Sequence, residues 1–401
     1  MDASLLDLFW EGFELESYEI PPPNSLLLRL APKSSQPPFC SDCGQATLLI
    51  HDVSRRHVRE RDLFNYWVWL EVPVRRVRCA DCGVRREKIR WLAGRRNLPQ
   101  ALVNYVEALV RLLPVKQVAE LLGLHWHTVK SIDHQRLTCE VTAPDLGRVQ
   151  RLIMDEFALF KGHRYATVAI CADTQQVLLI GEGRSRKAVR PFFEWMGKKV
   201  CRRIEAVAMD MNTAMDLEVQ KHCPKARVVY DLFHVVAKFG REVIDRVRVD
   251  QANLLRDSPA ERRVIKRSRW LLLRNPGNLS QEQGVKLEEL LAATAPLTTV
   301  YVLKTQLKEL WYAPSENEAR RRWGEWFAMA LDSGIKPLML FAKRLQSYLS
   351  GIVASAVFRL NTSVLEGMNN RIKVLKRMAY GYRDNDYFFL KIKAAFSGKT
   401  R

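Results

Sequence analysis

Four cysteines occur in two nearly identical turns, Cys40-Ser-Asp-Cys43-Gly and Cys79-Ala-Asp-Cys82-Gly. A CxxCG turn directs two thiolates toward one metal ion, and two such turns supply a tetrahedral four-sulfur site. A redox pair or coincidental turn cysteines are the alternatives, but neither needs a second copy of the turn. The spacing predicts one structural Zn²⁺ per chain, with no open position for catalytic water. We expect residues up to about Leu137 to fold only with zinc, because a small ribbon lacks a core of its own.

Three acidic residues are candidates to hold divalent cations. Asp155 lies inside an apolar run, Asp210 ends the run AVAMD, and Glu366 lies in a segment of helical periodicity. A charge in a buried strand is costly without a partner, and an α/β sheet presents ligands beyond its strand ends. A nuclease of the RNase H type needs acids on adjacent central strands and on a packing helix, so that two ions can flank one phosphate. Structural alternatives are a buried aspartate, a helix N-cap and a surface glutamate, and the competing acids are Glu156, Asp173 and Asp231.

The segment NTSVLEGMNNRIKVLKRM predicts an amphipathic helix. Its polar face carries Glu366, Asn370, Lys373 and Arg377, whereas Leu365, Met368, Ile372 and Leu375 lie on the opposite face. This stripe combines a metal ligand with cations that can meet phosphates. We therefore expect Lys373, Lys376 and Arg377 to contact DNA.

The elements that position these acids form a mixed α/β sheet. Three apolar runs, RLIMDEFALF, RYATVAICAD and QVLLIGEG, predict consecutive strands, and RIEAVAMD and ARVVYD alternate with helical segments. After ARVVYD no further segment has the pattern of a strand, and the stretch to about Ser350 predicts an all-α insertion. Near the other end, the prolines between Pro21 and Pro38 argue against a helix or a central strand. FNYWVWLEVPVRRVRC, between the cysteine pairs, favours strands.

Residues 115–137 have the spacing of a helix-turn-helix, with Gly123 in the turn. A plain helical hairpin is the alternative. His125 and His127 are expected to point to different sides of the helix, which favours polar contact over metal binding. The basic run Arg85, Arg86, Lys88, Arg90, Arg95 and Arg96 favours phosphate contacts, although it could be a solvated face. The residues expected to meet the major groove are His125, Trp126, His127, Lys130, Ser131 and His134.

Composition favours a nucleic-acid partner. The chain has 401 residues, enough for two or three domains, and a formal net charge of +20 from 64 Lys and Arg against 44 Asp and Glu. We expect no membrane span and no signal peptide, because no apolar run is long enough and the first residues lack a basic region. The cysteine pattern suits a reducing compartment. The expected location is the cytoplasm, in association with the nucleoid.

The order of these motifs resembles the insertion-sequence transposases of the ISL-three family. The resemblance is carried by CxxC…CxxC, the helix-turn-helix, IMDEFALFKGHRYATVAI, AVAMDMN, YDLFHVV and LEGMNNRIKVLKRMAYGYRDNDYFFLKI. It implies that Asp155, Asp210 and Glu366 are a DDE triad. Asp231 and His234 match the C/DxxH motif of related transposases and are carried over as secondary site residues. Asp384 departs from the family pattern, in which Asn is expected.

The resemblance and the residue chemistry imply a DNA transposase that acts on the terminal inverted repeats of its own element and on target DNA. Two Mg²⁺ or Mn²⁺ ions per active site are expected, with Asp155 bridging both, and a homodimer on DNA. Two alternatives are a transcriptional regulator with an inactive RNase H-like domain and an RNase H-fold nuclease for branched DNA. The expected architecture is a zinc-ribbon region (1–92), a helix-turn-helix domain (93–145), an RNase H-like domain (146–240), an all-helical insertion (241–350) and a C-terminal catalytic part (351–401).

Overall fold

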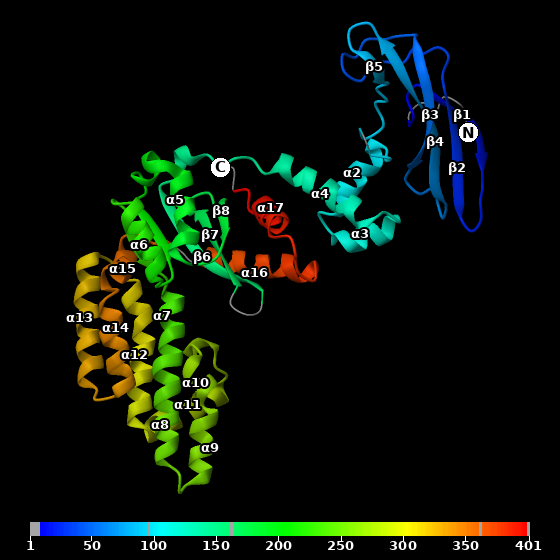
Figure 1. The fold of residues 1–401 in the computed structure, drawn as a ribbon. Coiled ribbons are helices and arrows are strands. Elements are labelled where there is room, and N and C mark those ends of the chain that lie inside the picture. Colours follow the sequence, from blue (N-terminus) through cyan, green and yellow to red (C-terminus); the bar gives the residue numbers. More distant parts are fainter. Residues whose placement is uncertain (1–8, 95, 161–163, 361–362, 399–401) are drawn as a thin grey trace. The chain divides into compact units, whose positions relative to one another are not determined.

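The computed structural model describes residues 9–94, 96–160, 164–360 and 363–398. The side chains of residues 308 and 363–366 lie outside the described part. The chain divides into two compact units, the first formed by residues 1–141 with 375–390 and the second by residues 142–374 with 391–401. Figure 1 shows one β-sheet in each unit.

The first unit begins with a five-stranded sheet of order β1-β2-β4-β3, in which β5 pairs with the end of β4. Strands β2 and β4 run parallel, and the other pairs are antiparallel. Alternate residues of β4 are buried, as a strand with one face on a core requires. The strands are β1 (Phe13–Glu19), β2 (Ser25–Pro32), β3 (Ile50–Arg59), β4 (Trp67–Cys79) and β5 (Gly83–Arg86).

The prediction of no central strand between Pro21 and Pro38 was wrong, because β2 lies there between β1 and β4. The prolines flank the strand, and Pro32 is its last residue. Every residue of the apolar stretch SLLLRLA therefore has a backbone N–H group available for hydrogen bonds to the neighbouring strands. This strand contributes Leu30 to a core with Trp10, Phe13 and the even-numbered residues Val68 to Val74 of β4. The sheet therefore has a core of its own.

Three helices follow, α2 (Gln100–Leu109), α3 (Val115–Leu122) and α4 (Trp126–Glu140). They enclose a second apolar cluster that includes Val106, Val118 and Ile132. Gly123 ends α3 in the left-handed conformation, with φ 59°, and a Cβ there would lie 3.2 Å from the Trp67 ring. This geometry confirms the helix, glycine turn, helix pattern read from the sequence.

The two halves of the first unit are joined by a buried arginine. Arg59, only 4% exposed, donates to the carbonyl oxygens of Val68 at 3.1 Å and Leu122 at 3.3 Å. Its guanidinium also lies over the rings of Trp67 and Trp69. The sheet and the turn after α3 are thus held by hydrogen bonds and cation–π contacts.

Residues 375–390 group with the first unit, although all of 351–401 was expected to belong to the catalytic domain. They span the end of α16 (Ser363–Met378) and the start of α17 (Asn385–Ala395). The Tyr387 hydroxyl donates to the buried Asp133 of α4, and Lys130 of α4 lies 2.7 Å from Asp384. Local sequence pattern carries no signal for such contacts between segments far apart in the chain.

The second unit contains a five-stranded sheet of order β10-β9-β6-β7-β8. Strand β7 is antiparallel to both neighbours, and β9 and β10 are parallel to β6. The strands and their connecting helices are β6 (Arg151–Phe160), β7 (Arg164–Cys171), β8 (Val177–Glu182), α5 (Arg186–Cys201), β9 (Ala206–Met209), α6 (Thr213–His222) and β10 (Arg227–Tyr230). The three consecutive strands followed by alternation agree with the sequence-based prediction.

Helices α5 and α6 cover one face of this sheet. Leu152 and Met154 of β6 point into a cluster with Phe192 and Phe193 of α5 and Val219 of α6. Successive strand residues alternate between faces, so Asp155 projects from the opposite side. The fully buried Glu218 of α6 holds the two helices together through Arg186 at 2.7 Å and Arg190 at 3.2 Å.

From Leu232 to Leu360 the second unit contains no strand, and all residues of this range are described. One apolar cluster runs through it and includes Trp323 and Trp326, neither of which is exposed. Gly351 approaches β10 so closely that a Cβ would lie 2.4 Å from the Tyr230 ring. The helices are α7 (Leu232–Phe239), α8 (Asp245–Leu254), α9 (Pro259–Arg267), α10 (Arg269–Leu273), α11 (Gln281–Ala293), α12 (Ala295–Trp311), α13 (Glu316–Asp332), α14 (Lys336–Gln346) and α15 (Leu349–Val353), with a π-helical turn at Gly240–Ile244.

Among the described residues, no helix is both long and apolar enough to cross a membrane.

Candidate functional site

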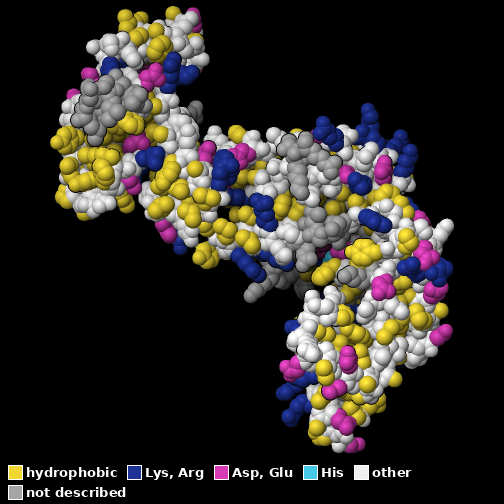
Figure 2. Space-filling model, turned by 180° about the vertical axis from the view of Figure 1, so that it is seen from behind, with side chains coloured by type: hydrophobic (Ala, Val, Ile, Leu, Met, Phe, Trp, Pro, Cys, Tyr) yellow, Lys and Arg dark blue, Asp and Glu magenta, His cyan; other side chains and the backbone are white. Residues whose placement is uncertain are grey.

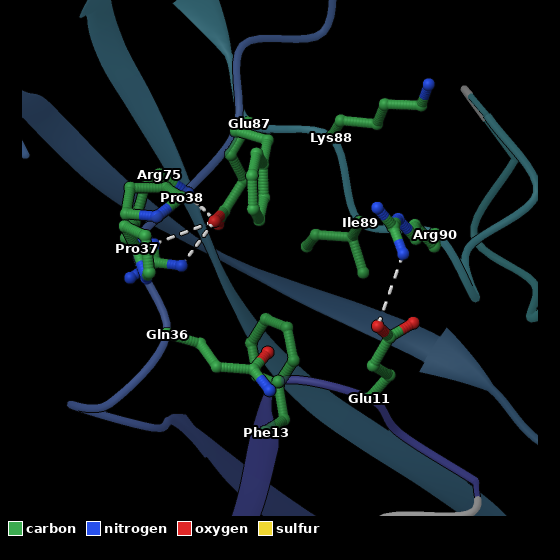
Figure 3. Close-up of a pocket in the computed structure, with 12 residues that line it drawn as sticks. Glu11, Phe13, Gln36, Pro37, Pro38, Arg75, Glu87, Lys88, Ile89 and Arg90 are labelled. Carbon is green, nitrogen blue, oxygen red and sulfur yellow. Dashed lines mark hydrogen bonds and ion pairs between the residues drawn. The ribbon is translucent and has the colours of Figure 1, made fainter. Parts of the chain in front are cut away.

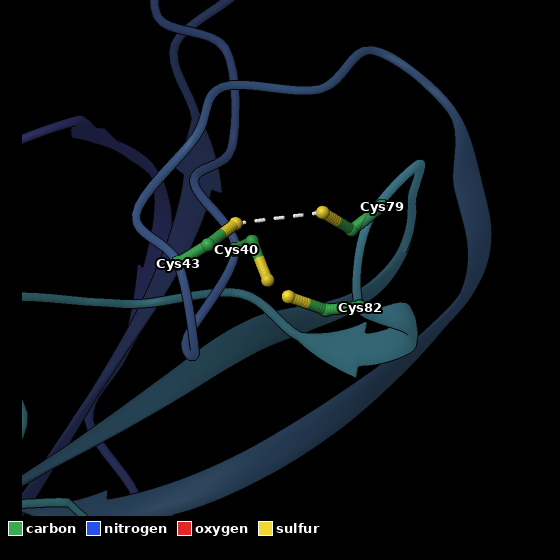
Figure 4. A group of neighbouring side chains, drawn as sticks. All are labelled: Cys40, Cys43, Cys79 and Cys82. Carbon is green, nitrogen blue, oxygen red and sulfur yellow. Dashed lines mark hydrogen bonds between the residues drawn. The ribbon is translucent and has the colours of Figure 1, made fainter.

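The four predicted zinc ligands converge at one end of the first sheet. Cys40 and Cys43 lie in the turn before β3, and Cys79 and Cys82 lie at the turn between β4 and β5 (Figure 4). Their Sγ atoms all lie within 4.8 Å of one another, and Cys43 and Cys79 are 3.5 Å apart. A tetrahedral site with Zn–S bonds of about 2.3 Å requires sulfur–sulfur distances of about 3.8 Å. The arrangement therefore fits one zinc ion.

Backbone geometry shapes both turns and favours a thiolate at the first cysteine of the first turn. Gly44 and Gly83, which follow the second cysteine of each turn, have φ values of 75° and 73°, in the left-handed region that glycine adopts most readily. Backbone N–H groups of Cys43 and Asp42 lower the pKa of Cys40 to about 7. Hydrogen bonding to the charged form stabilises a thiolate, the form that ligates metal. All four positions are filled by sulfur, so the site suits a structural ion.

The second candidate site lies in the other unit, at the middle of β6 and just beyond the end of β9. These strands pair in parallel with Ile153 opposite Ala208. Asp155 and Asp210 each lie two residues beyond that pair, so the two carboxylates occupy equivalent positions on adjacent strands. The sequence could place Asp155 inside a strand and Asp210 at a strand end, but only the pairing register brings them together.

The first carboxylate is fixed by two hydrogen bonds. Its Oδ1 accepts from the Glu156 backbone N–H at 2.7 Å, and its Oδ2 accepts from the Asn369 side-chain amide at 2.6 Å. Burial raises the pKa of Asp155, and the Asp210 carboxylate contributes to the rise, whereas both hydrogen bonds oppose it. Two carboxylates this close repel each other, and a bound cation would relieve that repulsion.

His234 of α7 faces two carboxylates with its two ring nitrogens. Its Nδ1 lies 3.4 Å from Asp210 Oδ2, and its Nε2 lies 3.8 Å from Asp231 Oδ2. Asp231 caps α7 by accepting from the Phe233 backbone N–H at 2.9 Å. The structure thus places Asp231 and His234, the two residues of the DxxH motif, beside Asp210.

Helix α16 reaches this site through Asn369. The sequence interpretation named Asn370 on the face of Glu366, but Asn369 makes the contact with Asp155, and Asn370 is exposed. Residues three apart on a helix are neighbours, as are residues four apart, which explains why periodicity alone did not separate the two asparagines. Glu366 lies in α16 one turn before Asn369, and its side chain lies outside the described residues. Met368 and Ile372 are buried as expected, whereas Lys373 and Arg377 are exposed.

The competing acids have other partners. Asp173 forms an ion pair with Arg151 at the surface. Glu156 accepts a hydrogen bond from the Asn212 side-chain amide, and the Asn212 Oδ1 accepts from the Ala214 backbone N–H at 2.9 Å at the start of α6. Glu156 and Asn212 were missed as a pair by sequence reasoning. Together they hold the turn that carries Asp210.

The predicted recognition helix α4 divides into two sets of side chains. His125, Trp126 and His127 are exposed at its start. The prediction that the two histidines point to different sides was wrong, because His125 is the N-cap and its ring stacks on that of His127 at 5.2 Å. No third possible ligand completes a metal site there among the described residues.

The other predicted residues of α4 already have partners within the unit. Lys130 pairs with Asp384 and lies over the Tyr387 ring, which also stacks on His134. Ser131 Oγ accepts from Arg96 at 3.1 Å. Asp384 also caps α17 by accepting from the Tyr387 N–H at 3.0 Å. This aspartate departs from the family pattern, and the Lys130 contact gives it a structural role. Arg95 lies outside the described residues.

Three family models match successive parts of the chain. Residues 36–82 match the zinc-finger of transposase IS204/IS1001/IS1096/IS1165. Residues 87–137 match the helix-turn-helix domain of transposase family ISL3, which is the ISL-three family, and residues 152–392 match the model of that family described as Transposase. The predicted order of modules is therefore confirmed.

Two curated relatives align with all or almost all of this chain. The transposase for insertion sequence element IS1001 of Bordetella parapertussis is 50% identical, with 100% of both chains aligned. The transposase for insertion sequence element IS1557 of Mycobacterium tuberculosis is 25% identical over 93% of this chain and 89% of its own.

Proposed function

Because the chain belongs to the ISL3 family of transposases, we propose that it cuts and joins DNA at the terminal inverted repeats of its own insertion sequence by a two-metal DDE mechanism. The observation that carries the proposal is the equivalent placement of Asp155 and Asp210 on adjacent parallel strands, with α16 reaching the first of them through Asn369. The strand order and the antiparallel β7 support an RNase H-like domain. The helices of residues 241–350 are then an insertion between Asp231 and Glu366.

The proposed triad is Asp155, Asp210 and Glu366. Two Mg²⁺ or Mn²⁺ ions, when bound, would supply the activation of a water or 3′-hydroxyl and the stabilisation of the leaving oxygen. Asp155 and Asp210 supply the negative charge that holds cations, and Asn369 fixes the orientation of Asp155. His234 fixes Asp210 and is in turn oriented by Asp231. Each of these neighbours limits the rotation of a carboxylate, which favours binding of the substrate phosphate in one geometry.

DNA recognition is divided among the modules. The exposed start of α4, with His125, Trp126 and His127, is proposed to read base edges in the major groove, since the first residues of a recognition helix usually do so. Lys130, Ser131 and His134 position this helix through their contacts with Asp384, Arg96 and Tyr387. The exposed Lys373 and Arg377 of α16, with Lys376, are proposed to contact phosphates near the cut. Joining two DNA ends requires two active sites in one complex, so a homodimer on DNA is part of the proposal.

The triad is tested by Asp155→Asn, Asp210→Asn and Glu366→Gln, assayed for cleavage and strand transfer on duplexes that carry the inverted repeats flanking the coding sequence. The amides keep size but remove the charge that holds the ions. Cleavage with Mg²⁺ should therefore fall by several orders of magnitude, while terminal-repeat binding is retained.

The matched control is Asp173→Asn, an amide substitution at an acid whose partner is a surface arginine. It should cleave within a few-fold of the parent. Near-parental cleavage by Glu366→Gln would refute the triad. A parent protein that binds the repeats tightly but never cuts them would favour a regulator with an inactive RNase H-like domain.

A further inference from the structure

A basic groove lies on the first sheet, between strands β3 to β5 and the segment 87–94 that crosses them. Its volume is about 1120 Å³. Ile89, Trp91 and Leu92 of the crossing segment pack on the apolar part of the sheet, so the groove opens where that core ends. Its lining includes Arg56 of β3, Arg76 of β4, Arg85 and Arg86 of β5, and Lys88 and Arg90 of the crossing segment.

Several of these cations are already neutralised. Arg85 Nε lies 2.5 Å from Asp42, Arg76 pairs with Asp52, and Arg90 lies 3.4 Å from Glu11. The one acid of the crossing segment, Glu87, is turned toward Arg75 at 2.7 Å, while the Lys88 side chain extends away from that pair (Figure 3). Acidic side chains of the lining therefore leave part of its positive charge uncompensated.

Three cations of the groove remain without an acidic partner among the described residues, namely Arg56, Arg86 and Lys88. Arg56 is half-buried, and both its burial and the positive charge of Arg86 lower its pKa. The pairing register places Arg56, Arg76 and Arg86 on one face, since Arg56 is opposite Val72 and Arg86 is opposite Arg76. Like charges held together on a rigid sheet lose repulsion when a polyanion binds.

On the face drawn in Figure 2, Lys and Arg side chains occur in several separate groups with Asp and Glu between them. The positive charge on this face is thus not confined to one patch, and cations near an acid contribute little to binding a polyanion. A site for phosphates is identified by cations that lack such acids.

We propose that the groove of the zinc-bearing sheet binds the DNA backbone through Arg56, Arg86 and Lys88. The inference rests on the proposed function and deepens it by assigning a surface to the sequence-independent part of DNA binding. The proposal assigns DNA contacts to Arg86 and Lys88, which belong to the basic run predicted from the sequence, but not to Arg85 of the same run. It adds Arg56, which lies on a different strand. DNA is favoured over an acidic peptide because the matching helix-turn-helix follows directly in the same unit.

The test uses the zinc-loaded full-length protein and a random-sequence duplex of about 40 base pairs, with affinity measured across a series of salt concentrations. Each phosphate contact contributes a slope of about −0.9 in log affinity against log salt. Arg56→Gln combined with Arg86→Gln should therefore flatten the slope by about 1.8 and weaken binding on the order of tenfold per lost contact at 0.1 M salt.

The matched control is Arg61→Gln combined with Arg78→Gln. Both arginines are exposed in the same unit, form no ion pair in the described part of the chain and do not line the groove. This double substitution removes the same net charge and should change the slope by less than half as much. Zinc content measured on each variant establishes that the sheet is intact.

If the salt slope flattened equally in the two double variants, the proposal that DNA binds in the groove would be overturned. The effect would then come from the loss of net charge. The proposal would also be overturned if the Arg56→Gln, Arg86→Gln variant kept the salt slope of the parent but no longer self-associated. That result would indicate that the groove binds an acidic segment of a second copy of the chain. A parent that fails to cut terminal-repeat DNA while the variants still differ in salt slope would refute the proposed function and leave the groove intact.

Discussion

The two units of this transposase both bury apolar clusters, but they differ in what surrounds those clusters. In the second unit one cluster runs from the edge of the sheet through the helices to Val353, with Trp323 and Trp326 fully enclosed, and another lies between the sheet and α5 and α6. The first unit has one cluster under its sheet and one among α2 to α4. Around its cysteine turns apolar residues are exposed instead, with Leu48 at 81% and Leu49 at 67%. Apolar packing extends through the second unit, whereas the cysteine end of the first carries a thiol cluster that fits a structural zinc.

The structure contradicts the premise behind the expectation that everything up to about Leu137 needs zinc to fold. That expectation assumed a ribbon without a core, but Leu70 and Val106 are fully buried in two apolar clusters that contain none of the four cysteines. Zinc dependence should be confined to the turns that carry the thiols and to β5, which follows the second turn.

Zinc removal should have the largest effect, and that effect should be limited to the cysteine end of the first unit. With the metal chelated, or with Cys79→Ser, amides in residues 39–46 and 79–88 should lose their hydrogen-exchange protection completely. Amides of α2 and of the central part of β4 should remain protected because their apolar contacts persist. Metal analysis should find one zinc per chain in the parent.

The control for this experiment is Cys139→Ser, since Cys139 is exposed on α4 and takes no part in the cluster. Its exchange pattern and zinc content should match those of the parent. Loss of protection across the whole of α2 and β4 on chelation would restore the view that the first unit folds only with zinc.

The next largest effect is expected in the core of the second unit. Trp323→Ala removes a fully buried ring that contacts Trp311, Trp326 and Phe327, and it should lower the free energy of unfolding by about 3–5 kcal/mol. Urea denaturation followed by tryptophan fluorescence and circular dichroism measures it. The control is Trp270→Ala, because the Trp270 side chain is 63% exposed. This substitution should lower the free energy of unfolding by less than about 1 kcal/mol. Similar losses from the two would contradict the view that the enclosed tryptophans stabilise the second unit more than a surface ring does.

The smallest effect concerns the ion pair between α4 and the C-terminal segment. Lys130 and the Tyr387 N–H lower the pKa of Asp384, and the contribution of its charge is therefore present at neutral pH and is lost as pH falls through the lowered pKa. Asp384→Asn keeps the helix cap but removes the charge, so it should cost less than about 1 kcal/mol at pH 7.

Unfolding curves at a series of pH values test this, because parent and variant should converge in acid. Asp386→Asn, at an exposed acid in the first turn of α17 that forms no ion pair among the described residues, is the control and should differ less from the parent at pH 7. A difference between parent and Asp384→Asn that grows in acid would show that the charge of Asp384 does not stabilise the native state.

The features that the sequence determined are those encoded within short segments. The CxxCG turns identify the zinc ligands because each turn fixes the geometry of its own two thiols. Gly123 marks the turn between α3 and α4 because its left-handed backbone favours glycine. Apolar runs located β6 to β10 and placed Asp155 inside a strand and Asp210 at a strand end.

The tertiary structure decided which distant residues meet. The register of β6 against β9 brings Asp155 beside Asp210, and the packing of α16 selects Asn369 where helical periodicity favoured Asn370. The same holds for Lys130, which was expected to face outward on the recognition helix but pairs with Asp384. Periodicity assigns a residue to a face but not to a partner, because partners are set by the packing of elements that lie far apart in the sequence.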